Sequence, residues 1–139
     1  MMKNELSIID LISEKHIELR REVEERWAEM GVDEISHTEA LLLAKINMGK
    51  ISIAEVARQA NISRQAMYKC AKKLEERGYL KFVVDEKNSK YTELTLKGEN
   101  YCIKSKKLKR EIENEISNII GEEGFLILKS ILNRSWILK

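Results

Sequence analysis

Three helix-start signals follow one another closely near the middle of the sequence, and they constrain the fold more than any other feature. Two are Ser-x-x-Glu patterns, at residues 36–39 and 52–55, and the third is Ser63. In such a pattern the serine oxygen accepts from the amide of the glutamate, while the carboxylate reaches back to the serine amide. We therefore predict a compact unit of three short helices, which follow Ser36 as far as Gly49, run from Ile53 to Gln59, and follow Ser63 as far as Gly78.

A β-hairpin is expected directly after these helices. Leu80–Val84 and Tyr91–Leu96 are runs of strand-forming residues, and the polar stretch Asp85–Lys90 separates them. The tip of this hairpin carries Lys87 and Lys90 but no apolar residue. It should therefore project into solvent or toward a polyanion.

Long helices are predicted on both sides of this central part. Between residues 5 and 30 apolar side chains recur at steps of three and four, and Gly31 ends the pattern. A second long helix should run from about Gly98 to about Ile120, with a break at 121–124 and a markedly apolar terminal helix at 125–138. A small domain cannot cover so much apolar surface, so we expect part of it to meet another chain.

Composition supports a mainly helical protein and places its basic charge in the middle of the chain. The 139 residues include no proline and only 6% aromatic residues, which favours long helices over a strand-rich sandwich. The net charge is +2, yet residues 58–90 alone carry nine Lys/Arg against four Asp/Glu. Such a cluster can attract phosphates, although lysines that merely solvate a helix face would give the same count.

The helix expected after Ser63 has two chemically different faces. On a helical wheel its apolar side holds Met67, Cys70, Ala71 and Leu74. The opposite side carries polar groups that can bond base edges and phosphates in a major groove, namely Arg64, Gln65, Tyr68, Lys69, Lys72 and Lys73. The sequence therefore indicates a helix seated on its apolar side and open to a partner on the other.

These features together resemble the multiple-antibiotic-resistance regulator (MarR) family of bacterial transcription regulators. The matching stretches are ISHTEALLLAKI, SIAEVARQANISRQAMYKCAKKLEERGYL and ELTLKG, in that order. The resemblance implies a mainly α fold with a small β-hairpin wing, a winged helix-turn-helix. It also implies a single domain over residues 1–139, with the DNA-binding unit at 35–97 and dimerisation helices at 5–30 and 98–138.

The resemblance further implies how such a protein would bind duplex DNA. The helix after Ser63 would enter the major groove and the hairpin tip would reach an adjacent minor groove. Positions at which the family touches DNA are here Ser63, Arg64, Gln65, Tyr68 and Lys69. We add Lys72 as a phosphate contact, and Lys87 and Lys90 as point charges in place of an arginine at the wing. The wing departs from the family pattern of acid-x-Arg, because Glu86, Lys87 and Asn88 stand there instead.

The function implied is a transcription regulator that acts as a homodimer on a pseudo-palindromic operator. Repression is the expected mode, relieved by a small ligand or an oxidant. The alternative function is that of a protein-interaction module, in which the winged helix binds a protein partner and no DNA.

Other residues give weaker signals. Cys70 and Cys102 lie 32 positions apart, with neither disulfide nor zinc spacing, so we expect inert buried thiols, a redox switch being the alternative. Trp27, Met48 and Tyr101 are expected in the core, with an inducer pocket as the alternative.

No site for a metal, cofactor or substrate is indicated. His16 and His37 lack partners at ligand spacing, and no catalytic motif is present, so we expect no metal, no cofactor and no enzyme. No segment has the length of apolar sequence that spans a membrane, and a cytoplasmic protein is expected.

Overall fold

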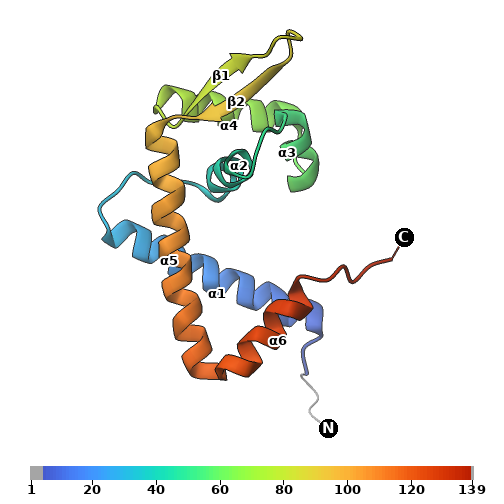
Figure 1. Ribbon diagram of the computed structural model, residues 1–139. Helices are drawn as coiled ribbons and strands as arrows, with labels where there is room; N and C mark the ends of the chain where they lie inside the picture. Colours follow the sequence, from blue (N-terminus) through green and yellow to red (C-terminus); the bar gives the residue numbers. More distant parts are fainter. Residues whose placement is uncertain (1–4, 139) are drawn as a thin grey trace. The chain divides into compact units, whose positions relative to one another are not determined.

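The computed structural model describes residues 5–138 and confirms a mainly helical chain with one β-hairpin (Figure 1). The elements, in chain order, are α1 (Ile8–Glu29), α2 (His37–Asn47), α3 (Ile53–Ala60), α4 (Arg64–Glu76), β1 (Leu80–Val84), β2 (Lys90–Leu94), α5 (Leu96–Ile120) and α6 (Glu122–Leu132). They form two compact units, one of residues 27–105 and one of the chain up to residue 26 together with the chain from residue 106. The winged unit predicted at 35–97 lies inside the first; that 1–139 behave as one domain stays a prediction.

The helix caps predicted from the sequence are present, with one difference. Ser36 and Glu39 form a complete capping box, in which the serine Oγ accepts from the Glu39 amide at 3.1 Å and Glu39 Oε1 accepts from the Ser36 amide at 2.9 Å. Ser52 likewise accepts from the Glu55 amide at 3.1 Å. The Glu55 carboxylate, however, pairs with Arg58 instead of reaching back, so the prediction of a second full capping box was wrong.

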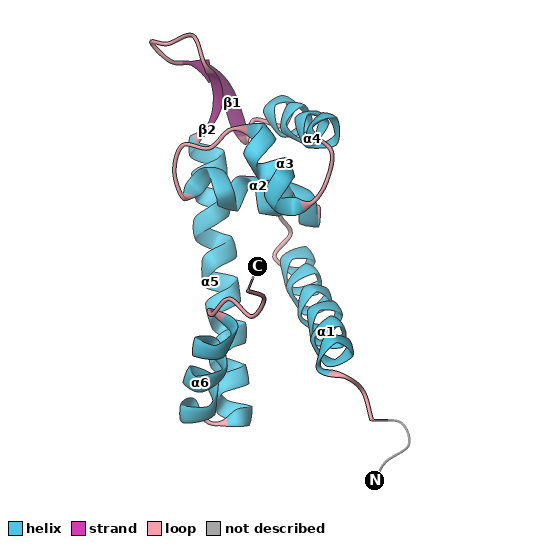
Figure 2. Ribbon diagram, turned by 90° about the vertical axis from the view of Figure 1, so that its right-hand side faces the viewer, coloured by secondary structure: helices cyan, strands magenta, loops and turns pink. Residues whose placement is uncertain are grey.

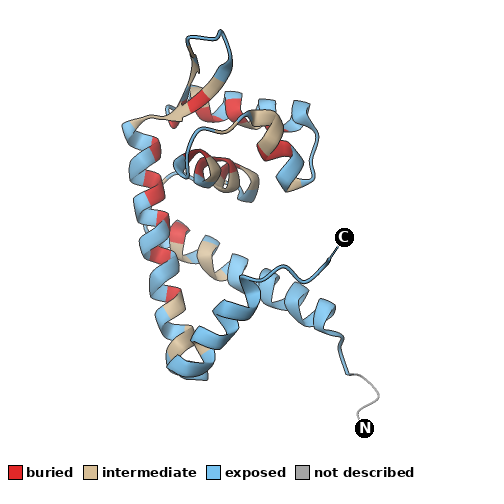
Figure 3. Ribbon diagram, turned by 45° about the vertical axis from the view of Figure 1, so that its right-hand side comes forward, coloured by how far each residue is buried: buried red, intermediate tan, exposed pale blue. Residues whose placement is uncertain are grey.

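The core of the 27–105 unit is built from the inward sides of α2, α3 and α4. Its apolar side chains are 0–2% exposed and come from all three helices and the start of β1: Leu42, Leu43, Val56, Ala57, Met67, Ala71, Leu74 and Leu80. In Figure 3 each of these three helices carries segments coloured as buried. The turn between α3 and α4 passes through Asn61, whose φ of 55° is a left-handed conformation that asparagine tolerates.

The wing is a two-stranded antiparallel sheet (Figure 2). Leu80 pairs with Leu94, Phe82 with Thr92 and Val84 with Lys90. The second strand ends at Leu94, two residues earlier than predicted.

Thr95 is the physical reason for this early end. Its Oγ1 accepts from the Gly98 amide at 3.2 Å and donates to the Gly78 carbonyl at 2.6 Å. The residue therefore caps α5, and Leu96 opens that helix instead of extending the strand. Gly98 lies so close to the hairpin that an added Cβ would be 2.1 Å from the Tyr79 carbonyl oxygen.

The outer helices also differ from the prediction at their ends. Gly31 ends α1 with a φ of +69°, as predicted. The break after α5 is confined to Gly121, with a φ of +91°, because α6 already starts at Glu122 and continues through Gly124. The terminal helix was predicted to reach Leu138 but ends at Leu132.

Two ion pairs join helices within the unit made by the chain's outer parts. Arg26 of α1 pairs with Glu115 of α5, and Lys129 of α6 lies 3.9 Å from Glu113 of α5. At least one side chain of each pair is substantially exposed to solvent, so each pair contributes little to stability. No helix within residues 5–138 combines the length and apolar character needed to cross a bilayer.

Candidate DNA-binding surface

Helix α4 exposes the polar side chains of its first turn to solvent and packs its opposite, apolar face against the core. Met67, Ala71 and Leu74 beneath it are fully buried, whereas Arg64 and Gln65 are exposed. Within the described residues neither of these two side chains forms an ion pair or a hydrogen bond. The predicted division of this helix into a seating face and an open face is therefore confirmed.

The N-terminus of α4 adds its own polar groups to this surface. Ser63 caps the helix by accepting from the Ala66 amide at 3.0 Å. The amides of the first turn point along the helix axis, where the helix dipole favours an anion. Lys69, one turn further on, is exposed.

Tyr68 and Lys72 are directed toward the wing. The Tyr68 ring is 47% exposed and its centroid lies 5.8 Å from that of Phe82 in β1, so it does not lie flat on its own helix. Lys72 Nζ is 4.7 Å from the Phe82 ring centroid and 3.2 Å from Glu75 Oε1. This hydrogen bond to Glu75 raises the pKa of Lys72 and keeps the lysine charged. A phosphate contact by Lys72 would therefore share its ammonium with Glu75.

The wing tip is a tight turn organised by one carboxylate. Asp85 Oδ1 accepts from the backbone amides of Lys87 and Ser89, both at 2.9 Å, and Asn88 adopts a φ of 63°. This turn leaves Lys87 exposed at the tip, and Lys90 is exposed where β2 begins. Lys50 also pairs with Asp85, which lowers the pKa of Asp85 and raises that of Lys50, so both remain charged.

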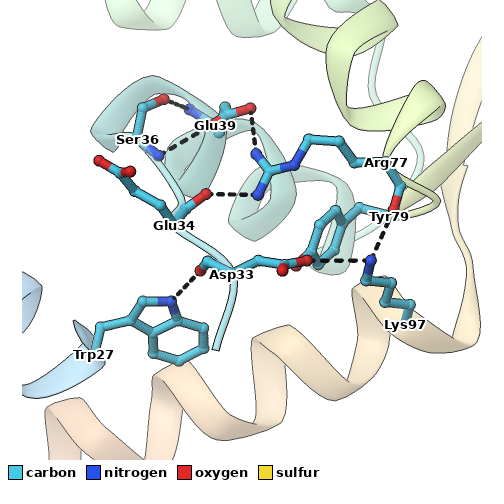
Figure 4. Close-up of polar contacts among 8 residues, drawn as sticks. All are labelled: Trp27, Asp33, Glu34, Ser36, Glu39, Arg77, Tyr79 and Lys97. Carbon is cyan, nitrogen blue, oxygen red and sulfur yellow. Dashed lines mark hydrogen bonds and ion pairs between the residues drawn. The ribbon is translucent and has the colours of Figure 1, made fainter. Parts of the chain in front are cut away.

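The C-terminal end of α4 is fixed by contacts that no pattern in the sequence predicts. Arg77, which follows the helix, reaches back to Glu39 of α2 at 3.1 Å and to the Glu34 carbonyl at 2.6 Å (Figure 4). Glu39 is 9% exposed and already belongs to the capping box of α2. The start of α2 and the end of α4 are therefore tied together through one carboxylate.

Asp33 is the centre of a second group of contacts beside Arg77. Its carboxylate accepts from the Tyr79 hydroxyl at 2.7 Å and lies 3.2 Å from Lys97 Nζ, and its carbonyl accepts from Trp27 Nε1 at 2.7 Å (Figure 4). The Tyr79 hydroxyl, followed by Lys97, lowers the pKa of Asp33. Burial and the nearby Asp33 raise the pKa of Tyr79 to about 12. These bonds connect the segment after α1 to Tyr79, directly before β1, and to Lys97 at the start of α5, on either side of the hairpin in the sequence.

The cysteines and the proposed pocket residues belong mostly to the core. Burial raises the pKa of the Cys70 thiol to about 11, which disfavours the reactive thiolate. Cys102 is buried with its Sγ 3.7 Å from the Leu43 carbonyl oxygen. Trp27 and Tyr101 pack edge to face, 5.0 Å between ring centroids, whereas Met48 is 83% exposed, so its predicted place in the core was wrong. Among residues 5–138 no three His, Cys, Asp or Glu side chains gather into a possible metal site.

Residues 48–81, which contain α3 and α4, match a family described as winged helix-turn-helix DNA-binding. No curated protein matches the sequence of the chain. Solved structures nevertheless share its fold over nearly the whole length.

One such structure is a mutant of MarR from E. coli, with a TM-score of 0.75, 16% identity, and 94% of this chain and 96% of that chain covered. The transcriptional regulator BldR from Sulfolobus solfataricus gives a TM-score of 0.71 at 21% identity, with 97% and 100% covered.

The MarR family protein Rv2887 from Mycobacterium tuberculosis matches in two complexes. In complex with DNA it gives a TM-score of 0.72 at 21% identity, with 92% of this chain and 96% of that chain covered. In complex with salicylic acid it gives 0.72 at 21% identity, with 94% and 97% covered.

Of these three proteins, BldR is described as a transcriptional regulator. The resemblance inferred from the sequence is confirmed at the level of the fold. Residues 48–81 match a winged helix-turn-helix DNA-binding family, and the chain that carries them has the fold seen in the solved MarR structure.

Proposed function

We propose that this chain is a MarR-type transcription regulator that binds a specific duplex DNA site as a homodimer and represses by blocking access to a promoter. The observation that carries this proposal is the open first turn of α4. Arg64 and Gln65 stand exposed above a fully buried seat, inside the segment that matches a DNA-binding family. A guanidinium and an amide are the groups that read guanine and adenine edges in a major groove.

Each contact residue has its own role in this proposal. Arg64 and Gln65 read base edges, with Tyr68 beside them braced by Phe82. Ser63, Lys69 and Lys72 hold phosphates and fix the register of α4 on the duplex. Lys87 and Lys90 of the wing approach the neighbouring backbone as point charges, because no arginine is present at the tip to fit a narrow minor groove.

The exposed apolar side chains of the outer helices support a homodimer. On α1, Ile9 is 74% exposed and Ile12 is 40% exposed, and α6 leaves Leu126, Ile127 and Leu132 more than half exposed. Clustered exposed apolar side chains on a monomer are typical of a protein–protein interface. A two-fold dimer would place its two α4 helices about 34 Å apart, one turn of DNA.

Relief of repression is proposed to come from a small organic molecule instead of an oxidant. Cys70 is half-buried with its pKa raised to about 11, and Cys102 is buried, so neither thiol has the properties of a redox sensor. Rv2887 binds salicylic acid, which makes aromatic acids the class to test first. A rise in melting temperature with salicylate, together with release of bound DNA, would support this part.

Gel-shift titration against genomic fragments at two salt concentrations tests the central claim. A dimer that contacts about six phosphates would lose roughly a thousandfold in affinity between about 50 and 200 mM salt. Retention of no fragment at either salt concentration would contradict the proposal and favour a winged-helix module that binds a protein partner.

Three alanine variants then distinguish base-specific contacts from nonspecific phosphate contacts. Arg64→Ala should weaken binding to the specific site by about tenfold or more while leaving random DNA nearly unchanged. Lys69→Ala should weaken binding to all duplexes and lower the salt slope by about one. Arg58→Ala is the matched control, because this exposed arginine of α3 already pairs with Glu55. Equal losses on specific and random DNA from Arg64→Ala would contradict the assignment of Arg64 to base reading.

A further inference from the structure

The wing needs support from outside itself, because a two-stranded hairpin is marginally stable at best in water. One face of it has an evident partner. Phe82 packs near Tyr68 of α4, and Thr92, its partner across the hairpin, is 3% exposed. Tyr91 precedes Thr92 in β2, so its side chain starts from the opposite face.

Lys50 contacts this second face. It lies in the connection between α2 and α3, and its Nζ is 4.4 Å from the centroid of the Tyr91 ring. The same ammonium is 2.8 Å from Asp85 Oδ2 at the end of β1. The lysine therefore makes a cation–π contact with one strand and an ion pair at the end of the other.

Asp85 divides its two oxygens between the tip and this lysine. Oδ1 accepts from the amides of Lys87 and Ser89, whereas Oδ2 accepts from Lys50. The Asp85 side chain is 20% exposed, against 58% for that of Lys50, so the carboxylate is partly shielded from solvent. A single carboxylate thus joins the turn that carries Lys87 to the loop that precedes α3.

We propose that Lys50 is a positioning residue for DNA binding, which holds the wing through Asp85 and Tyr91 so that Lys87 and Lys90 meet the duplex. This inference rests on the proposed function and adds a residue to it. Lys50 is not a phosphate contact in this proposal, although its charge alone would suggest one. The substitutions Lys50→Met and Asp85→Asn distinguish the two roles, because they change the net charge in opposite directions.

Both substitutions should weaken binding to the specific site by about fivefold, the range expected for one surface ion pair. Asp85→Asn keeps an oxygen for the two tip amides but turns an amide group toward the Lys50 ammonium. The double variant should bind about as well as either single variant, because both remove the same contact. Lys50→Arg should restore binding to within about twofold, and Lys50→Met should leave the salt slope unchanged.

Glu86→Gln is the matched control for Asp85→Asn. It removes the same charge one residue further along the exposed tip, where Glu86 forms no ion pair within the described residues. Removal of a negative charge near phosphates should tighten binding slightly, by about twofold at most. The proposal is overturned if Asp85→Asn tightens binding as this control does, or if Lys50→Met lowers the salt slope by about one.

A measurement without DNA separates failure of this inference from failure of the proposed function. Amide hydrogen exchange at Lys87 and Ser89 reports how firmly the tip is held. Lys50→Met should speed exchange at these amides by about threefold or more, and Glu86→Gln should leave it unchanged. Unchanged exchange in Lys50→Met would overturn the positioning role even if the wild-type protein binds no DNA. Faster exchange in a protein that binds no DNA would show that Lys50 holds the wing tip and that the proposed function alone has failed.

Discussion

Helices α2, α3 and α4 bury a set of large apolar side chains inside the unit of residues 27–105, whereas α6 leaves most of its own in solvent. Leu42, Leu43 and Leu74 are 0% exposed in the first, while Leu126 is 59% and Leu132 is 55% exposed in the second (Figure 3). The hydrophobic effect acts equally on both, at about 25 cal/mol per Å² of apolar surface. The first unit buries a core within one chain, whereas the apolar side chains of α6 are left exposed for the partner in the proposed homodimer.

The largest effect should follow from a cavity in the completed core. Leu74→Ala removes a fully buried side chain from the seat of α4 and should cost about 2–5 kcal/mol of stability. Urea unfolding followed by circular dichroism measures this loss. Met48→Ala, at a position 83% exposed, is the control and should change stability by less than about 0.5 kcal/mol. Similar losses for both variants would mean that the unit's core lies elsewhere.

A charge on α6 should separate the two chains of the proposed homodimer without unfolding the winged unit. Leu132→Glu places a carboxylate on the exposed apolar face and should weaken dimerisation by about 30-fold, or about 2 kcal/mol. Sedimentation velocity at several concentrations measures the equilibrium. Leu96→Glu puts the same charge at a 73% exposed site at the start of α5 and should leave the dimer intact. A wild-type protein that sediments as a monomer would contradict the comparison itself.

The ion pair between Arg77 and Glu39, which joins α4 to α2, should contribute to the stability of the 27–105 unit. Arg77→Met leaves Glu39 largely buried without its ion-pair partner and should cost about 1–2 kcal/mol. Thermal unfolding measures the loss. Lys81→Met removes a comparable charge from a solvent-exposed cross-strand pair with Glu93, and a loss as large as that of Arg77→Met would refute the special role of the pair between Arg77 and Glu39.

The smallest effect concerns the charge of Asp33 and depends on pH. The folded protein lowers the pKa of Asp33 from its ordinary value of 3.8, chiefly through the Tyr79 hydroxyl. A lowered pKa in the folded state stabilises at pH values above the ordinary pKa, and this stabilisation is lost as pH falls through the folded value. Asp33→Asn should therefore be less stable than wild type near neutral pH, and the difference should shrink in acid below about pH 4. A difference that stays constant into acid would show that the charge of Asp33 plays no part.

Local features of the structure could be predicted from the sequence, and contacts between distant segments could not. The caps at Ser36 and Ser63 and the two faces of α4 follow from spacing alone, since each depends on residues within a few positions. The prediction of a second capping box was wrong because Arg58, one turn further along α3, pairs with the Glu55 carboxylate. Strand β2 ends early because Thr95 caps α5. The high β-propensity of threonine had placed this residue in the strand.

The long-range contacts carried no signal in the sequence. Lys50 and Asp85 are 35 positions apart, and Arg77 and Glu39 are 38 apart. A lysine or arginine in a charged sequence has many possible partners, and only the packing of the helices selects one. The candidate DNA-contact residues of α4 could be proposed from the two faces of that helix, whereas the residues that hold α4 and the wing in place required the structure.

At Gly98, α5 lies so close to the backbone at the base of the hairpin that no side chain, not even a methyl group, fits between them. An alanine there would put its methyl group 2.1 Å from the Tyr79 oxygen and 3.2 Å from Leu94 Cδ2. No rotamer change can relieve an overlap with a backbone atom, so α5 and the first strand would have to part. One added methyl group would thus displace the base of the wing, although Gly98 is far in the sequence from the exposed first turn of α4.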